Sequence, residues 1–198
     1  GWSSGKAAKF DAFDAKAEVI ALLAAAGVAT EGLMVLGDAG DHYHPGQSAT
    51  LRMGPKNVLA AFGSLHPATA KTFDLDGAVI AAEIFLDAIP LKKGAGFMRP
   101  AFTPPALQAV TRDFAFLVPE QLHAGDLVRA IKGCDKDNIA AVRLFDRFAG
   151  QGVPDGQVSL AIEVSLQPSD KSYTDDELKA ISDRVVTAAS KQGAALRG

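Results

Sequence analysis

Long hydrophobic runs and cysteine pairs are both missing from this 198-residue sequence. No apolar segment approaches the roughly 18 to 20 residues that span a bilayer, so we expect no membrane-spanning helix. The one cysteine, Cys134, excludes an internal disulfide and suits a reducing cytoplasm. The start lacks the hydrophobic segment of a signal peptide and is typical of a piece excised from a longer chain. We therefore expect a cytoplasmic location.

An excess of positive charge is also missing, since the formal net charge is −3. Proteins that bind nucleic acid on their own usually draw affinity from a basic surface, because neutralised phosphates release counterions. The composition therefore disfavours a stand-alone nucleic-acid binder. If the chain contacts nucleic acid, the contact must be local, with most of the affinity supplied elsewhere.

Catalytic motifs are scarce as well. The Gly94-Ala95-Gly96 triplet lacks the strand and helix that a phosphate-binding loop requires. The histidines His42, His44 and His66 could suggest zinc, but no cysteine is near, and two of them precede prolines at expected turn corners. We expect no catalytic residue, metal or cofactor in this chain. A small metal-dependent enzyme built on the three histidines remains an alternative.

The first half is expected to be an antiparallel sheet with one main helix. The spacing of Val19, Leu22, Leu23 and Ala26 predicts a helix with one buried stripe. The expected helix and strands are 14–26, 33–36, 47–53, 57–65 and 78–89, with Gly54-Pro55 as a hairpin turn and a short helical turn after His66-Pro67. The segment 78–89 could also form a helix, but its β-prone residues favour a strand.

Proline, glycine and lysine gather in the middle of the chain and predict a linker at 91–103, between domains at 1–90 and 104–198. After the linker the expected order is strand, helix, strand, strand, helix. These elements are 110–118, 124–132, 139–148, 158–166 and a helix from Thr174 capped by Glu177, with a short strand at 194–196. That order is typical of an α+β, ferredoxin-like βαββα domain, with two helices on one face of an antiparallel sheet.

Strand alternation separates two faces of this expected sheet. Val158 and Leu166 begin and end an apolar alternation, so Ser159 should be exposed on the open face. For the strand 110–118, either Phe114 and Phe116 stack on a ligand or they fill the core. We favour the core, because small Ala115 fills one poorly; Ala115 and Asp113 then lie on the open face.

Asp146 and Phe148 end the second strand of this domain, on one face if that strand is regular. A carboxylate accepts hydrogen bonds from base amino groups, and an aromatic ring stacks on a base. The chemistry alone also fits a solvated strand end with a half-buried ring, and that alternative stays open.

Several short motifs, in this order and spacing, resemble the C-terminal part of the bacterial phenylalanyl-tRNA synthetase β subunit. The motifs are Phe13-Asp14-Ala15-Lys16, His44-Pro45-Gly46-Gln47-Ser48-Ala49, Gly63-Ser64-Leu65-His66-Pro67, Val110-Thr111-Arg112-Asp113, Val142-Arg143-Leu144-Phe145-Asp146 and the segment 171–177. The resemblance implies that 1–90 ends a catalytic-like domain with the class II synthetase fold, an antiparallel α/β fold without catalytic function. It implies that 104–198 is a ferredoxin-fold anticodon-binding domain.

The resemblance further implies that the chain recognises the anticodon of the phenylalanine tRNA, tRNA(Phe), within an ATP-dependent phenylalanine–tRNA ligase of two α and two β subunits. ATP and magnesium would bind the α subunit, and the isolated chain would be inactive. The expected tRNA-binding residues are Arg112, Asp113, Ala115, Asp146, Phe148 and Ser159. Many relatives carry tyrosine in place of Phe148, which preserves stacking but adds a phenol hydroxyl. The rival interpretation is a non-RNA regulatory or oligomerisation module that uses the same sheet.

Overall fold

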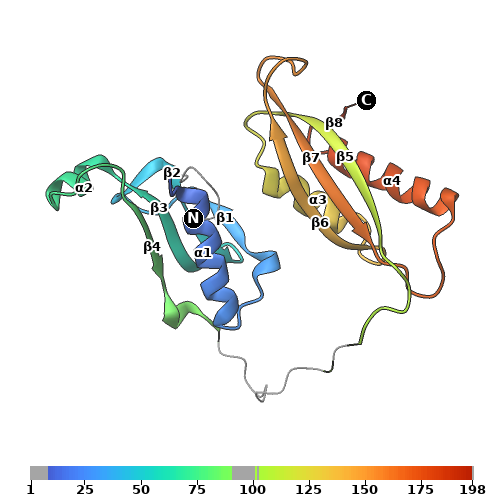
Figure 1. The fold of residues 1–198 in the computed structure, drawn as a ribbon, viewed down its shortest axis with the longest axis horizontal. Helices are drawn as coiled ribbons and strands as arrows, with labels where there is room; N and C mark the ends of the chain where they lie inside the picture. Colours follow the sequence, from blue (N-terminus) through green and yellow to red (C-terminus); the bar gives the residue numbers. More distant parts are fainter. Residues whose placement is uncertain (1–8, 91–100, 102, 198) are drawn as a thin grey trace. The chain divides into compact units, whose positions relative to one another are not determined.

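The computed structural model describes residues 9–90, 101 and 103–197, and the chain divides into two compact units, 1–98 and 99–198 (Figure 1). Each unit has its own hydrophobic core. Most of the linker predicted at 91–103, namely 91–100 and 102, lies outside the described residues.

The first unit contains a four-stranded antiparallel sheet with the strands in sequence order. The strands are β1 (Met34–Leu36), β2 (Tyr43–Met53), β3 (Asn57–Leu65) and β4 (Ile80–Ile84). Residues 54–56 form the turn of the β2–β3 hairpin, as predicted. The preference for a strand within 78–89 is confirmed by β4, and a short 3₁₀ helix, η2 (Leu86–Ala88), follows it.

Helix α1 (Ala12–Ala25) lies against β3 and β4. It begins at a capping box, in which the Asp11 carboxylate accepts from the backbone N–H of Asp14 and the Asp14 carboxylate accepts from that of Asp11. Its buried stripe is Ala15, Val19 and Leu23. The prediction that Leu22 and Ala26 belong to this stripe is wrong. Leu22 is 56% exposed, because the stripe follows a strict spacing of four, and Ala26 is exposed just after the helix ends. The shorter helices are α2 (Pro67–Thr72) and η1 (Thr30–Gly32).

The second unit has the predicted order of strands and helices and adds the short last strand. Its elements are β5 (Val110–Pro119), α3 (Ala124–Gly133), β6 (Ile139–Phe148), β7 (Gln157–Leu166), α4 (Asp175–Ser190) and β8 (Ala195–Leu196). The sheet order is β6-β7-β5-β8, every neighbouring pair is antiparallel, and α3 and α4 lie together along one face (Figure 1). The Thr174–Glu177 capping box at the start of α4 is confirmed.

The core of the second unit lies between this sheet and its two helices. The apolar face of β7 is buried throughout, as its alternation predicted. Phe116 is fully buried, and Phe114 packs against the same core with its ring stacked beside that of Phe116, at 5.9 Å between centroids. The preference for the two phenylalanines as core residues is confirmed. The opposite face of the sheet therefore carries the alternate residues of each strand.

Within the described ranges, the helices are too short or too polar to cross a membrane.

Replacing Phe116 with alanine should destabilise the second unit by about 3–5 kcal/mol, because a fully buried ring is lost and a cavity remains. The measurement is urea-dependent hydrogen exchange of the β7 amides, which reports on this unit alone. The exposed Phe145→Ala serves as a control and should change the free energy by about 0.5 kcal/mol or less. Equal losses in the two variants would contradict the assignment of Phe116 to the core.

Candidate nucleic-acid interface

The face of the second sheet opposite the helices presents cross-strand rows on β5, β7 and β6. Three adjacent rows are Asp113–Glu163–Arg143, Ala115–Ala161–Asp146 and Leu117–Ser159–Phe148. Residues paired across neighbouring strands point to the same side of a sheet. We call this surface the open face. It brings together five of the six predicted tRNA-binding residues.

A β-bulge at Phe145 decides which side of the sheet the end of β6 presents. Leu144 pairs with the fully buried Ile162, and Asp146 pairs with the next β7 residue, Ala161, so Phe145 has no partner in the ladder. In a regular strand, residues two positions apart face the same side, so Asp146 would lie with Leu144 on the helix-covered side. The extra residue shifts this alternation by one. Asp146 and Phe148 share the open face because the strand is irregular, which sequence reasoning had not foreseen.

The Phe148 ring rests against the start of the β6–β7 loop. A Cβ placed on Gly150 would lie only 3.0 Å from Cζ of Phe148, so the ring occupies the space that a side chain at 150 would need. The side chain of Phe148 is nevertheless 43% exposed, and Asp146 is exposed one position before Arg147. A partly exposed ring and an exposed carboxylate are thus held on the same rim of the sheet.

Ser159 corrects one prediction. It occupies the open face, but it is only 6% exposed, so the expected exposure is wrong. The reason is its position in the middle strand, between the larger side chains of Leu117 and Phe148. A ligand meets these neighbours before it meets the Ser159 hydroxyl.

Strand β5 places its candidate tRNA-binding residues on different sides of the sheet. Asp113 and Ala115 pair with Glu163 and Ala161 and lie on the open face. Arg112 pairs with the buried Val164, so its side chain lies on the helix-covered side, where it is exposed near the beginning of β5. The structure therefore does not bring Arg112 together with the other five.

Two further features of strand β6 were not predicted. Phe145 is 49% exposed beside Asp146, and Arg143 forms an ion pair with Glu163, with 3.4 Å between Nε and Oε1. The apolar Leu144-Phe145 pair interrupts the alternation of β6 and is the sequence signal that could have indicated the bulge.

The three histidines of the first unit take part in separate local interactions. His42 Nε2 lies 3.1 Å from Glu83 Oε2, while Nδ1 of His44 and of His66 each accept a backbone N–H, from Gly46 and Ala68. Among the described residues, no three histidine, cysteine or acidic side chains gather in a way that could hold a metal ion.

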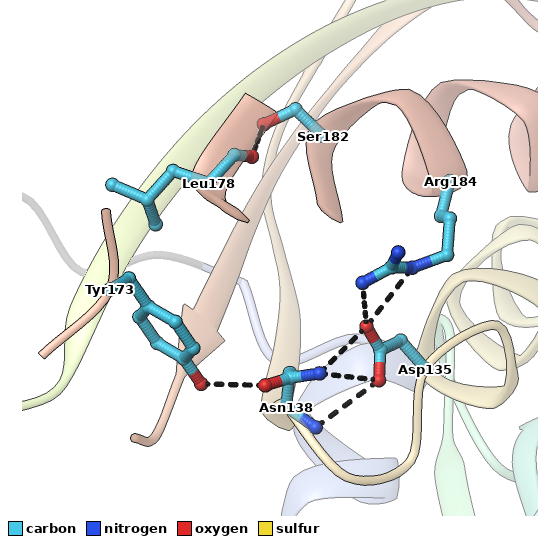
Figure 2. Close-up of polar contacts among 6 residues, drawn as sticks. All are labelled: Asp135, Asn138, Tyr173, Leu178, Ser182 and Arg184. Atoms are coloured by element: carbon cyan, nitrogen blue, oxygen red, sulfur yellow. Dashed lines mark hydrogen bonds and ion pairs between the residues drawn. The ribbon is translucent and has the colours of Figure 1, made fainter. Parts of the chain in front are cut away.

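A second polar cluster, on the helical layer, was missed by sequence reasoning (Figure 2). Asp135, which follows α3, has a side chain only 7% exposed. Its Oδ2 accepts from Nε and Nη2 of Arg184 on α4, at 3.1 and 2.6 Å, and Asn138 Nδ2 donates to both carboxylate oxygens. The Tyr173 hydroxyl donates to Asn138 Oδ1 at 3.1 Å. The cluster ties the α3–β6 turn to α4, with every carboxylate oxygen occupied.

The electrostatics of this layer are those of a structural ion pair. Burial raises the pKa of Asp135, but the hydrogen bonds from Asn138 and Arg184 and the guanidinium charge outweigh burial and place that pKa below its usual value. At the start of α4, the Thr174 backbone N–H and the side chains of Lys171 and Thr174 lower the pKa of Glu177 to about 2. Both carboxylates are therefore ionised at neutral pH. They stabilise helix α4 through hydrogen bonds and ion pairs and do not act as acids.

Comparison with known proteins places both units in one family. Residues 105–197 match the family model "Ferredoxin-fold anticodon binding domain", and residues 1–86 match "Phenylalanyl tRNA synthetase beta chain CLM domain". The chain is 67% identical over 198 residues to the phenylalanine–tRNA ligase beta subunit of Novosphingobium aromaticivorans. It is 54% identical over 196 residues to that of Zymomonas mobilis. The chain belongs to the phenylalanyl-tRNA synthetase β-chain family.

The alignments with these two β chains include 100% and 99% of this chain but only 25% of each relative. The resemblance inferred from short motifs is confirmed, and the ferredoxin-like fold of the second unit agrees with its family model.

Replacing Asp135 with asparagine should lower the free energy of unfolding of the second unit by about 1–3 kcal/mol at pH 7, since charge-assisted hydrogen bonds to a buried carboxylate are lost. The figure is modest because Arg184 is half exposed. The folded pKa lies below the unfolded one, so this contribution is present above about pH 4 and is lost as the pH falls through the folded pKa.

The measurement is the unfolding free energy of both proteins between pH 7 and pH 3, where the gap between them should narrow. Asp137→Asn, an exposed neighbour, should stay within about 0.5 kcal/mol of the wild type. A gap that is constant across this pH range would contradict a stabilising role for the Asp135 charge.

Proposed function

We propose that the second unit recognises the anticodon of tRNA(Phe) through its open face. The observation that carries the proposal is the bulge at Phe145, which gathers an exposed carboxylate and an exposed ring on one rim. Carboxylates accept hydrogen bonds from base edges, and aromatic rings stack on unpaired bases of RNA loops. The anticodon-binding description of the matched family supports the same assignment. The proposed contacts are Asp113, Ala115, Asp146 and Phe148, together with the buried Ser159 that pairs with Phe148.

The charge of the open face fits a reader of bases better than a binder of phosphates. Asp113, Glu163 and Asp146 carry negative charge, and Arg143 is paired with Glu163. Such a surface gains little from phosphate neutralisation. The unit then contributes selectivity, and other parts of a larger assembly supply most of the affinity.

We further propose that the chain serves as one part of an ATP-dependent phenylalanine–tRNA ligase. In that enzyme, two α and two β subunits assemble in the cytoplasm, and the α subunit holds ATP and magnesium. The first unit acts as a catalytic-like class II synthetase domain that supports the assembly without performing chemistry. The family membership and the antiparallel sheet with its helix support this role.

Replacing Phe148 with alanine should weaken binding of a tRNA(Phe) anticodon stem-loop by about 1–3 kcal/mol, because one base loses its stacking partner. Replacement with tyrosine should preserve binding, since a phenol stacks equally well. Fluorescence titration with the cognate loop and with a scrambled loop on the same stem provides the measurement.

The matched control is Phe73→Ala, an exposed phenylalanine of the first unit. It should leave both affinities unchanged. A wild-type chain that binds the scrambled loop as tightly as the cognate loop would refute the anticodon assignment and favour the non-RNA interaction module.

A further inference from the structure

Helix α1 of the first unit is more apolar than its contacts with the sheet require. The eight residues 19–26, at the end of this helix, are all apolar. Of these, Val19 and Leu23 are buried against the sheet, whereas Leu22 and Ala24 are exposed. A helix that is apolar on several sides is usually enclosed by other elements. The sheet covers one side of α1, so we expect a neighbour on at least one more.

A second apolar stripe runs along α1 beside the buried one. Its members follow a spacing of four, three and four, which keeps side chains on one side of a helix; they are Phe13, Ala17, Ile20 and Ala24. Phe13 is 79% exposed, and the two alanines are exposed as well. A protruding ring followed by small residues suits close packing against another helix, because alanines let a second backbone approach.

A groove of about 450 Å³ lies next to this stripe, on the side of the sheet that α1 occupies. Phe13 lines the groove from the helix, and Val35, Ala49 and Phe62 line it from strands β1, β2 and β3. Phe62 is a core residue beneath α1, and Ala49 is its cross-strand partner, so both face the helix side. Val35 is 45% exposed. The groove is therefore an apolar space between α1 and the first two strands.

The width of the first sheet leaves room for a helix in this groove. A helix with its side chains is about 10–12 Å across, and neighbouring strands are about 4.8 Å apart, so one helix covers about two strands. Helix α1 lies against β3 and β4, which is one half of the sheet. The second unit, also with four strands, carries two helices along one face (Figure 1). In the described part of the first unit, the other α-helix, α2, has only six residues.

The missing helix has an available source in the rest of the β chain. The alignments with the two relatives include only 25% of each, so three quarters of a complete β chain lie outside the matched region. A helix in that part would be covalently connected to the first unit. The connection raises its effective concentration at the groove, so a modest apolar surface is enough to hold it.

We propose that the groove beside α1 binds a second helix, which comes from the three quarters of a complete β chain outside these 198 residues. That helix covers the Phe13–Ala24 stripe and the β1–β2 half of the sheet. The inference concerns the first unit and goes beyond the anticodon recognition proposed for the second. Either can therefore fail without the other.

The first test identifies what lies in the groove. Phe13 is replaced by the photo-crosslinking residue p-benzoylphenylalanine in a complete β chain bound to its α subunit. That β chain is the Novosphingobium aromaticivorans relative, with its matched quarter exchanged for these 198 residues. After illumination, peptide mass spectrometry should find a cross-link to a helical segment of the remaining β chain. A cross-link to the α subunit, to a second β chain or within these 198 residues, or none at all, would contradict the proposal.

The second test measures whether the stripe is covered. Ala17→Cys and Ala24→Cys should react rapidly with N-ethylmaleimide in the 198-residue chain at every protein concentration, since both positions are exposed. In the complete β chain both should react at least about ten-fold more slowly, because a buried thiol reacts only when its cover opens. Peptide mass spectrometry reads the labelling at each introduced cysteine.

Glu18→Cys is the matched control on the same helix. At 3.6 residues per turn, its side chain points about 100° or more away from every member of the stripe, so it should react equally fast in both chains. Equal rates for Ala17→Cys in the two chains would show that nothing covers the stripe. Labelling of the 198-residue chain that slows as its concentration rises would assign the stripe to a second copy. Either result would overturn the proposal.

Discussion

The open face depends on one backbone irregularity, the bulge at Phe145. From Ala141 to Leu144, strand β6 alternates its side chains in step with β7, whose Ile162 and Val164 are buried under the helices. One unpaired residue then reverses the alternation, and Asp146 and Phe148 emerge beside Ala161 and Ser159. The same device re-aims functional side chains at the edges of many sheets. β6 can tolerate it because β6 is an edge strand with a neighbour on one side only.

The rest of the second unit keeps that edge in place. The apolar face of β7 packs against α3 and α4, and the Asp135–Arg184 pair joins the turn before β6 to the last helix. Burying the phenylalanines of β5 leaves the small Ala115 on the other side, so a ligand can approach the sheet closely. Packing on one face thus determines the shape of the other. The proposed function, in which bases are read and phosphates are not neutralised, fits a module with little positive charge.

The sequence alone predicted the parts of this arrangement that depend on local patterns. The alternation of Val158 to Leu166, the Thr174–Glu177 capping box and the βαββα order are short-range signals, and each is confirmed. The bulge, the burial of Ser159 and the pairing of Asp135 with Arg184 depend on neighbours distant in sequence, which periodicity cannot register.

The most direct test of the central claim is an alanine-methyl NMR titration of the chain with the tRNA(Phe) anticodon stem-loop. Ala115 and Ala161 form the floor of the open face, whereas Ala180 and Ala188 lie on α4 in the helical layer. The account predicts saturable shifts of the first two methyl signals, with the α4 signals unchanged. Shifts confined to the α4 methyl groups, or none at all at saturating RNA, would contradict the assignment of the open face as the anticodon site.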